Sequence, residues 1–540
     1  MMGLNRKLPS VKNNQYAMVA KTDVPRSTFL TEFTVKDTID AGVVYPFHVD
    51  EVLPGDHHRG SVQIFARLQT SVFPPMDGGD IETFYFFVPA RLVWQNWERF
   101  MGQQDNPSDS ISYLIPQVQS ANGGFAINSI YDHFGIPCAG QVLPGNPITV
   151  NALPLRCYNL IWTEWFRDQD LQSSLPLPLG DGPDAVNTYG LQPRNKKADM
   201  FTSARPWPLK GGVQPSLPIS GIINVQPLNN AVGPMFKKGA GPLPTGQLQA
   251  GSTGTPTMSI QAGNTAAWVV GDVLNWSSPN LTVDLSTAQG STVNAMRNTM
   301  AIQQLLERNA RSGTRYTEQL QADWGVHPDD GRMQRPEYIG GGRSRLQSQA
   351  MPQTSPNSGS NYMGSLAGAA IVNDNHSFSY HATEHGYIIG LINLSLDVTY
   401  QQGLPRMWTR KTRYDFYNPV FANLGERAIR NDELYADGSA NDTLTFGYNE
   451  NWCEYRTYTS RICGQFRSRS AGTIDPWHYA QNFATLPALN ATFIIQPNTL
   501  ARSLSAGVAA ANMQLIVDSY WQLRRTRALP MFSDPGLKRF

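Results

Sequence analysis

The chain has 540 residues, about three to four times a typical domain length, which excludes a single small domain. Lys and Arg (43) balance Asp and Glu (42), and charged residues make up only 16% of the chain, against about 25% in an ordinary soluble protein. With 41% hydrophobic and 10% aromatic residues the composition excludes disorder, and it fits either a large core or surfaces buried against further copies of the chain.

The amino-terminal part predicts an arm followed by strands. Residues 1–27 hold five basic side chains without hydrophobic periodicity, which indicates an arm or a frayed end. Residues 60–70 alternate between apolar and polar side chains, as a half-buried strand does. Residues 81–88, IETFYFFV, form a nearly continuous β-branched and aromatic run that ends at Pro89, which predicts a more deeply buried strand.

Two helical patterns follow these strands. Trp94, Trp97 and Met101 recur at i, i+3 and i+7 before a glycine, so residues 91–101 predict a short amphipathic helix. Residues 155–168, LRCYNLIWTEWFRD, place aromatic and apolar side chains on one face of a stronger helix. Burial in a core or an interface explains that face without a cofactor.

A polar stretch with few charges interrupts the pattern. Residues 211–290 are rich in Gly, Pro, Thr, Ser, Asn and Gln, which predicts an insertion folded as a small β-like outgrowth or a functional surface feature. Residues 291–309 return to a helical pattern. Apolar side chains alternate again in residues 392–399 and 513–523, so strands flank a helical middle. This order predicts a β-sandwich closed by distant segments, with loops enlarged into subdomains.

Patterns for nucleotide chemistry and acyl transfer are missing from the sequence. The chain has no GxxxxGK[ST], no GxGxxG after a strand and no GxSxG. The glycine triplet at 340–342 fits a flexible turn better than a phosphate cradle. We therefore expect no nucleotide cofactor.

One motif match bears on metal chemistry. His381, Glu384 and His385 match the HxxEH pattern of metallopeptidases, in which two zinc-binding histidines lie on a helix. The β-forming neighbours predict a strand instead, on which the two histidine Cα atoms would lie ~13 Å apart. His57 and His58 lie in a predicted turn, as a solvated loop or a subunit contact. The sequence therefore predicts no metal site.

The four cysteines and the apolar runs indicate the compartment. Cys138, Cys157, Cys453 and Cys463 form no CxxC pair and are too few for a disulfide scaffold, so we expect free buried thiols in a reducing compartment. The first 20 residues lack an apolar segment, and no run of 18 apolar residues occurs. We therefore expect neither a signal peptide nor membrane insertion.

Basic residues gather at both ends of a chain whose net charge is only +1. Such side chains neutralise phosphates without a fixed motif, so we expect sequence-independent contact with nucleic acid; the alternative is a pair of solvated tails. The candidate contact residues are Arg6, Lys7, Arg524, Arg525, Arg527, Lys538 and Arg539.

Eight stretches are long and distinctive enough to indicate relatives. They are PGDHHRG (54–60), FFVPARLVWQNWERFMG (86–102), YDHFGIP (131–137), LPLRCYNLIWTEWFRDQDLQ (153–172), LLERNARSGTRYTEQLQADWGV (305–326), QRPEYIGG (334–341), FGYNENWCEYRTYTSRICGQFRS (446–468) and DPWHYAQNF (475–483). In these stretches the chain resembles the major capsid proteins of microviruses, and specifically the gokushovirus branch of these small icosahedral phages with single-stranded DNA. Asn418 departs from the resemblance, since an aromatic residue is more usual at that position.

The resemblance implies a mainly β fold, an eight-stranded jelly-roll β-sandwich with long inter-strand insertions that contain helices. It implies sixty copies in a T=1 icosahedral shell, built through pentamers, around a circular single-stranded DNA genome. Residues 211–290 would form a variable protrusion at the threefold axes. The expected layout is an amino-terminal arm (1–27), a first set of jelly-roll strands (28–90), insertions with helices (91–364), a second set of strands (365–527) and a basic tail (528–540).

We therefore predict a major capsid protein without enzymatic activity, which encloses the genome and attaches to the host through its surface insertion. Trp268 and Trp276 are the candidate receptor contacts. The implied partners are further copies of the chain, the DNA, the internal scaffolding, small DNA-binding and pilot proteins of the phage, and a host cell-surface receptor. The expected place is the virion, assembled in the host bacterial cytoplasm. The alternatives are a jelly-roll carbohydrate-binding or glycan-processing protein that uses the HxxEH residues, and a cellular nucleic-acid-binding module.

Overall fold

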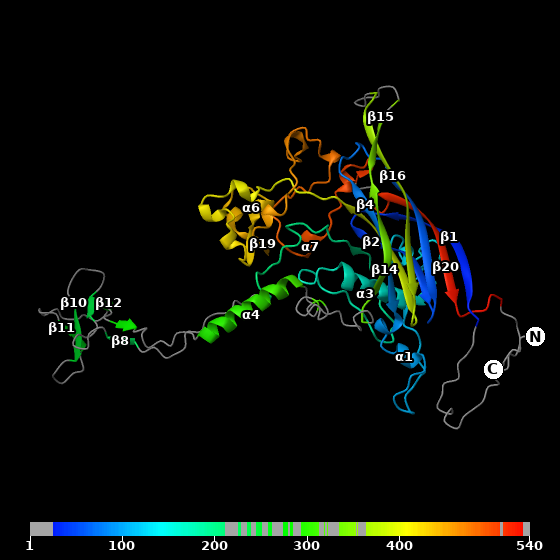
Figure 1. The fold of residues 1–540 in the computed structure, drawn as a ribbon, viewed down its shortest axis with the longest axis horizontal. Coiled ribbons are helices and arrows are strands. Elements are labelled where there is room, and N and C mark those ends of the chain that lie inside the picture. The colour runs from blue at the N-terminus through cyan, green and yellow to red at the C-terminus, as the bar shows by residue number, and fades with distance from the viewer. Residues whose placement is uncertain are drawn as a thin grey trace, which may run out of the picture. The chain divides into compact units, whose positions relative to one another are not determined.

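Eight long antiparallel strands build the sandwich of this protein (Figure 1). They are β1 (Ser27–Ile39), β2 (Val43–Val52), β3 (His57–Leu68), β4 (Gly79–Pro89), β14 (Glu337–Leu346), β16 (Leu366–His381), β17 (Gly386–Leu396) and β20 (Leu515–Arg527). The computed structural model describes residues 25–210, 334–352, 363–507 and 511–532, together with one helix and short strands between 225 and 312. The chain divides into two units, Met1–Pro208 with Ser312–Phe540, and Leu209–Arg311.

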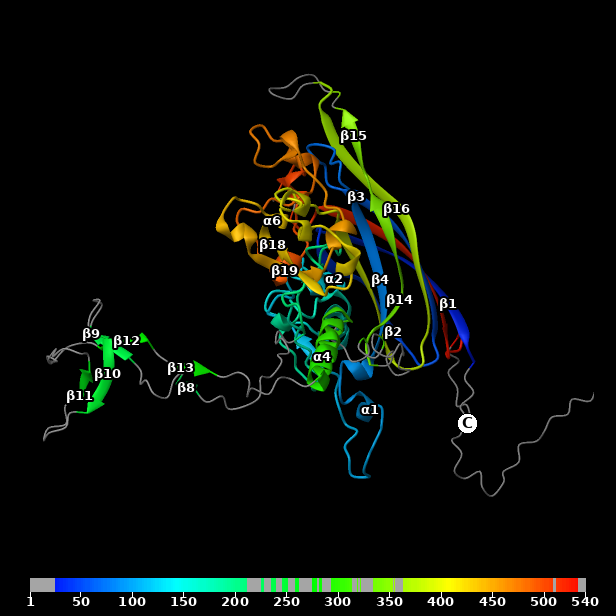
Figure 2. The same ribbon diagram turned by 60° about the vertical axis from the view of Figure 1, so that its left-hand side comes forward.

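The pairing of the strands defines a jelly roll. The pairs are nested along the chain: β1 with β20, β2 with β17, β3 with β16 and β4 with β14, all antiparallel. Because β20 also pairs with β3, and β17 with β4, two four-stranded layers result, β1-β20-β3-β16 and β14-β4-β17-β2. Between the layers β14 pairs with β16 at Gly340↔Phe378, so the sheet curls from one layer into the other (Figure 2). The predicted fold class, a mainly β jelly-roll sandwich with insertions, is confirmed.

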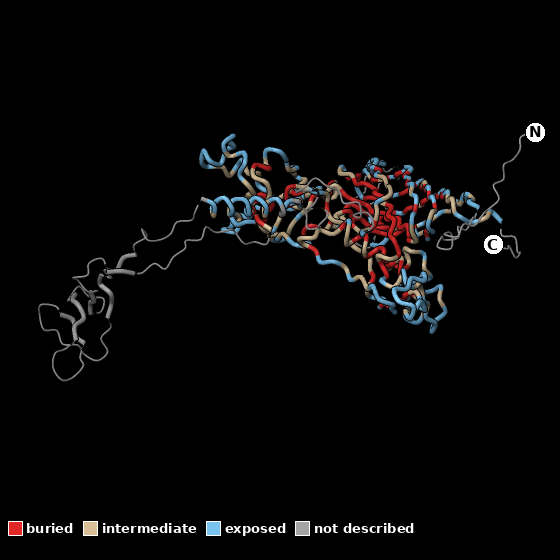
Figure 3. The backbone as a smooth tube through the Cα atoms, turned by 60° about the horizontal axis from the view of Figure 1, so that its bottom comes forward, coloured by how far each residue is buried: buried red, intermediate tan, exposed pale blue. Residues whose placement is uncertain are grey.

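The core lies between the two layers, where the buried residues concentrate (Figure 3). Along β3 every second side chain is buried, which confirms the alternation predicted for this strand. Trp521 of β20 is fully buried, and the centroid of its ring lies 5.0 Å from that of Phe47 and 5.9 Å from that of Tyr85. Since Phe47 and Tyr85 belong to the opposite layer, this ring ties the two layers together.

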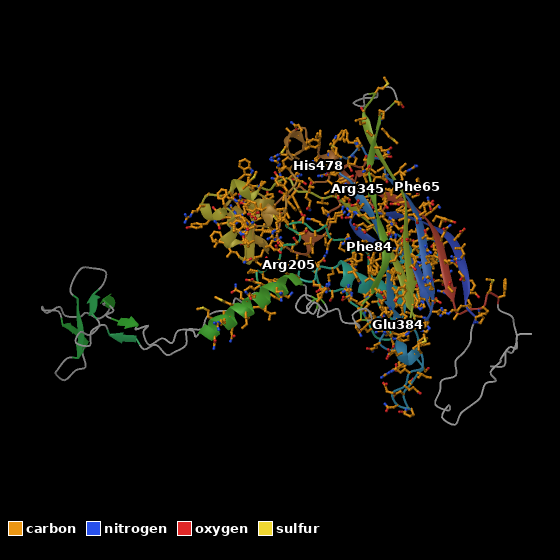
Figure 4. The ribbon with its side chains drawn as sticks, in the orientation of Figure 1. Phe65, Phe84, Arg205, Arg345, Glu384 and His478 are labelled. Carbon is orange, nitrogen blue, oxygen red and sulfur yellow. The ribbon has the colours of Figure 1, made fainter. Side chains whose placement is uncertain are left out.

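The outer faces of the two layers differ. Helix α3 (Leu153–Ile161) and its neighbours cover β4 and β17, so Asn393 and Ser395, the polar positions of the strand predicted there, are buried as well. Phe84 of β4 packs edge-on against Phe166, with ring centroids 5.2 Å apart. Among the described residues, the outer face of the other layer carries exposed side chains: Phe65 of β3 is 43% exposed (Figure 4 labels Phe65 and Phe84).

A buried ion pair stabilises the segment of the chain that connects β4 to β14. The side chain of Arg156 on α3 is fully buried and donates from Nε and Nη2 to the two carboxylate oxygens of Asp184, at 2.8 and 2.7 Å. Arg156 also donates to the carbonyls of Val93 and Gly180, and the Tyr189 hydroxyl donates to Asp184. Every group of the pair is thus satisfied without water.

The predicted helices differ in their outcome. The helix expected at 155–168 is confirmed, since α3 continues into a π-helical turn, η3 (Trp162–Phe166). The helix expected at 91–101 is wrong in its length: two short pieces, η2 (Ala90–Leu92) and α1 (Trp97–Phe100), replace it. The reason is a backbone hydrogen bond from Gln95 to Leu179, outside the helical ladder.

Shorter elements fill the two long connections of the sandwich. Between β4 and β14 lie β5 (Gln117–Gln119), α2 (Ile130–His133), β6 (Thr149–Asn151), η4 (Val186–Thr188) and β7 (Gln192–Pro193). Residues 397–514, called the β17–β20 insertion, hold η7 (Arg406–Trp408), η8 (Arg413–Asp415), η9 (Pro419–Phe421), β18 (Glu426–Arg430), α6 (Asn431–Leu434), η10 (Ala440–Thr443), β19 (Thr445–Glu450), η11 (Cys453–Tyr455), η12 (Gly464–Phe466), η13 (Asp475–Trp477), α7 (Ala491–Ile494) and η14 (Leu500–Arg502). β15 (Ser348–Pro352) pairs with the first part of β16.

The second unit contains the predicted insertion and the helix after it. Its strands are β8 (Val225–Pro227), β9 (Met235–Lys238), β10 (Thr245–Ala250), β11 (Met258–Gln261), β12 (Leu274–Ser278) and β13 (Leu281–Val283), and α4 (Val293–Ser312) confirms the predicted helix. Four of the strands form one antiparallel sheet, in the order β11-β10-β9-β12. Trp276 lies on β12, and Trp268 lies outside the described residues.

Two local predictions are wrong. The glycine triplet is not a flexible turn but part of strand β14. Glycine is needed there because a Cβ at Gly341 would lie 2.2 Å from the carbonyl oxygen of Thr83, and one at Gly342 would lie 2.3 Å from the ring of His376. The glycines thus allow close packing between strands. Cys463 is exposed, whereas the other three cysteines are buried as expected; all four are free.

Candidate nucleic-acid interface

The first and last strands bring the two ends of the described chain together. Ser27 at the start of β1 pairs with Arg527 at the end of β20, and Thr28 Oγ1 lies 2.9 Å from Thr526 Oγ1. The basic segments before residue 27 and after residue 527 therefore leave the sandwich from the same edge. The predicted contact residues in these segments, Arg6, Lys7, Lys538 and Arg539, lie outside the described residues.

Two of the predicted contact arginines are held by a buried cluster of Asp50, Asp56 and His58. Arg525 Nη1 lies 3.1 Å from Asp50 Oδ1, and Arg527 Nε lies 2.8 Å from Asp56 Oδ2. The His58 ring lies between the carboxylates, 3.4 Å from Asp50 and 3.3 Å from Asp56. Burial alone would raise the pKa of Asp50, but the His58 hydrogen bond and the Arg525 charge hold that pKa below its usual value. Both arginines therefore balance internal charges.

The turn predicted at His57 and His58 is wrong. Both residues belong to β3, and the alternation of the strand buries His58 in the cluster while it exposes His57. The sequence gives no apolar alternation at 57–60, which reads His-His-Arg-Gly, so only the pairing of the strand shows that the burial of every second side chain continues back to His57. Of the two carboxylates that face His58, Asp56 lies only two residues before it, whereas Asp50 belongs to β2, and local periodicity does not indicate that contact.

The HxxEH residues have separate neighbours. His381 ends β16, and the predicted strand stops there because the next four residues form the turn to β17. Glu384 makes an ion pair with Arg91 at 2.8 Å, at the end of the sandwich near α1 (Figure 4). The ring of His385 packs against Trp97 with centroids 5.7 Å apart. In the described part of the chain no group of three or more His, Cys, Asp or Glu side chains could hold a metal ion.

Arg524 lies on the outer face of the layer β1-β20-β3-β16, called here the open face because its described side chains are largely exposed. It is exposed and stands opposite Arg59 in the register of β20 and β3. Lys36 and Asp518 form an exposed ion pair at 3.1 Å on the same face. The side chains of the open face include Leu30, Glu32, Lys36, Arg59, Gln63, Phe65, Arg67, Ile371, Asn373, Asn375, Ile516, Asp518, Tyr520 and Arg524.

The open face combines three kinds of group that a nucleic acid contacts. Its arginines can neutralise phosphates, its amides and hydroxyls can bond to bases or sugars, and the exposed rings of Phe65 and Tyr520 offer stacking surfaces. Sequence reasoning missed Arg59 and Arg67. The signal was their position among the polar residues of the alternating strand, which predicted the same face for both.

A cavity of about 810 Å³ beside β1 was also missed. Its lining comes from distant segments and includes Phe33, Phe47, His48, His133 and Phe134. Burial lowers the pKa of His48 to about 4, so its ring is neutral near pH 7, and its Nε2 atom is buried without a hydrogen-bond partner in the structure. No local pattern in the sequence connects these residues.

Known proteins match this chain over nearly all of its length. The family described as Capsid protein (F protein) matches residues 17–537. Capsid protein VP1 of Bdellovibrio phage phiMH2K is 43% identical over 511 residues, which cover 92% of this chain and 93% of that protein. Capsid protein VP1 of Chlamydia phage 1 is 37% identical and covers all of both chains, and that of Spiroplasma virus 4 is 31% identical over 97% of this chain and 98% of its own length. Among the described helices, none has the length and apolar character needed to span a membrane.

Proposed function

Since the chain belongs to the phage Capsid protein (F protein) family, we propose that sixty copies of it assemble through pentamers into a T=1 shell around a circular single-stranded DNA genome. Family membership confirms the resemblance seen in the sequence, and it makes this chain a structural protein of the virion. We further propose that the chain has no catalytic role. The single observation that carries the proposal is the family match over residues 17–537, and the nested strand pairs of a jelly roll agree with it.

Exposed apolar side chains support assembly from many copies. The β17–β20 insertion exposes large apolar side chains such as Trp408, Val420 and Leu424. Water contact with so much apolar surface is unfavourable, and contacts between copies would remove it. This agrees with the low charged fraction of 16%.

The genome contact that we propose lies on the open face and the two basic ends. Arg524 and Arg59 are exposed side by side, and both basic ends start from the same edge of the layer. Such contacts neutralise phosphates without reading bases, so they weaken as salt concentration rises. Arg525 and Arg527 contribute little to this contact, since Asp50 and Asp56 already pair with them.

The remaining partners follow from the family. We propose that the chain assembles in the host bacterial cytoplasm with the internal scaffolding, small DNA-binding and pilot proteins of the phage. Attachment to a host receptor would use the insertion at 211–290, on which Trp276 occupies β12. The few charges of this insertion favour contacts through aromatic and polar side chains.

The test is co-expression of the chain with its neighbouring phage genes, followed by electron microscopy and a nuclease-protection assay. We expect closed shells of uniform size that protect single-stranded DNA. A double variant, Arg59→Glu with Arg524→Glu, should form shells with less protected DNA. The matched variant Arg59→Lys with Arg524→Lys keeps both charges and should protect as much DNA as the unchanged chain.

Two results would contradict the proposal. Only small oligomers in the presence of all phage genes would refute the closed shell. Equal amounts of protected DNA in the Glu and Lys variants would refute a genome contact at Arg59 and Arg524. Replacing Arg525 or Arg527 would be a poor test, because it would leave Asp50 or Asp56 without its partner in the buried cluster.

A further inference from the structure

Strand β16 continues beyond the sandwich as one half of a two-stranded ribbon (Figure 2). Residues 371–381 of β16 pair with β3, whereas residues 366–370 pair with β15. In the described part of the chain β15 pairs with β16 alone. We call residues 348–352 and 366–370 the ribbon, and it lies at the end of the sandwich opposite α1 (Figure 1).

The base of the ribbon is fixed to the loop between β3 and β4. Gly368 and Ser71 exchange two backbone hydrogen bonds, each 3.1 Å long. A Cβ at Gly368 would lie 2.8 Å from the Cα atom of Pro74, so this loop packs directly against the strand. Ala370, the next residue on the same face of β16, is buried. The ribbon is therefore held in place where it leaves the sandwich.

Farther from the sandwich the ribbon exposes apolar side chains on both of its faces. Met351 pairs with Ala367 and is 51% exposed. Leu366 pairs with Pro352 and is 40% exposed. Directly paired residues share a face and successive residues alternate, so Met351 and Leu366 lie on opposite faces. Because an isolated two-stranded ribbon is only marginally stable in water, these faces indicate a partner on each side.

The ribbon carries no charged side chain. Between Arg345 and Asp374 the sequence contains no Asp, Glu, Lys or Arg. Exposed strand edges are usually protected from pairing with other chains by charged side chains, and the edge of β15 lacks them. Contact with nucleic acid or with anionic lipid would require basic residues, which are missing as well. These observations favour a protein surface as the partner of the ribbon.

A segment without charge suits a position near a rotational symmetry axis of identical copies. At such an axis each side chain comes close to the same side chain of other copies, so any charge there would meet its own sign. A ring of three or more copies also gives every member two neighbours, one on each side, whereas a twofold axis gives only one. The apolar side chains on both faces of the ribbon therefore fit a ring better than a twofold contact.

We propose that the ribbons of the five copies in a pentamer gather around its axis, each packed between the ribbons of two neighbours. The proposal rests on the proposed shell, which supplies the pentamer, and it adds the segment of the chain that lies at the pentamer axis. The partner of each ribbon is thus the same segment of further copies. In this arrangement the exposed apolar side chains of the ribbon are removed from water.

The experiment places charges on the ribbon and counts shells by electron microscopy after co-expression with the neighbouring phage genes. Met351→Lys and Met351→Glu should each reduce the yield of shells by about fivefold or more, since one pair of like charges about 4 Å apart weakens a contact by that factor even in water. When the two variants are expressed together in equal amounts, most neighbouring charges around the axis become unlike. The yield should then rise several-fold above that of either variant alone.

Met101→Lys and Met101→Glu are the matched controls. Met101 is 48% exposed and directly follows α1, at the other end of the sandwich (Figure 1). Mixing these two variants should give no more shells than either one alone. Because Met351 and Met101 are both about half-exposed, all four variants should fold, which circular dichroism checks.

The outcomes separate this contact from the proposed function. If the unchanged chain forms closed shells and the charged Met351 variants form as many, only the ribbon proposal fails. Low yields that mixing the two Met351 variants does not raise would also overturn it, since the ribbon would then face a different surface, either of this chain or of the scaffolding protein. If the unchanged chain itself forms no closed shells, the proposed shell fails and the ribbon contact fails with it.

Discussion

Replacing Trp521 by alanine should separate the two layers of the sandwich. A buried tryptophan removes about 150–250 Å² from water, and at about 25 cal/mol per Å² this corresponds to about 4–6 kcal/mol. Such replacements in cores cost about 3–5 kcal/mol. Trp521 is fully buried and contacts rings in both layers, so we expect the free energy of unfolding to fall by about 4 kcal/mol.

Guanidinium denaturation of the full-length, unassembled chain, followed by circular dichroism, measures this loss. Trp408→Ala is the matched control, because Trp408 is 68% exposed and its removal should change the free energy by less than about 0.5 kcal/mol. We also expect Trp521→Ala to form few shells at 37 °C while Trp408→Ala keeps its fold. If both variants unfold at the same denaturant concentration, the argument that Trp521 ties the layers together is refuted.

Three further substitutions test the packing and the charges of the described residues. Asp184→Asn leaves Arg156 buried without its carboxylate and should cost about 3–5 kcal/mol by denaturation, whereas an equal stability would show that the pair is dispensable. Gly341→Ala places a Cβ against the Thr83 carbonyl and should cost about 1–3 kcal/mol, while Gly180→Ala, with nothing within 4 Å, should have little effect on the melting temperature. His48 has a pKa of about 4 in the folded chain against 6.5 in the unfolded chain, so unfolding takes up a proton between these values and stability falls as pH drops from 6.5 to 4. His48→Gln should flatten this dependence in denaturation curves at pH 7 and pH 4.5, and an unchanged slope would contradict the assignment.

The fold was predictable wherever one strand or helix carries its own period. The alternation in β3 and β20 and the aromatic face of α3 identify these elements, because one face of each meets the core. A local sequence pattern does not predict the structure where a contact with a distant part of the chain determines it. Gly341 reads as part of a turn, and only the Thr83 carbonyl across the strand pair explains a glycine there.

The candidate site was predictable only in part for the same reason. Charge alone grouped Arg524, Arg525 and Arg527, but the period of the strand sends Arg524 outward and the other two toward Asp50 and Asp56. The cavity beside β1 gave no signal, since its lining comes from segments as far apart as Phe33, His133 and Val517. Sequence spacing does not show which charged residues from distant parts of the chain form ion pairs, and so it does not show which charges are balanced.

The nested strand order also determines when the layer β1-β20-β3-β16 can form during synthesis. Thr28 of β1 meets Thr526 of β20 across 498 positions, so the layer β1-β20-β3-β16 cannot close until almost the whole chain has left the ribosome. At about 5–20 residues per second, β1 waits ~25–100 s for its partner. Throughout that interval the edges of β1 and β3 are open to other chains, so a ribosome that stops before β20 releases a product prone to aggregate. Co-translational protection by chaperones should therefore matter more for this protein than for one whose neighbouring strands pair in sequence.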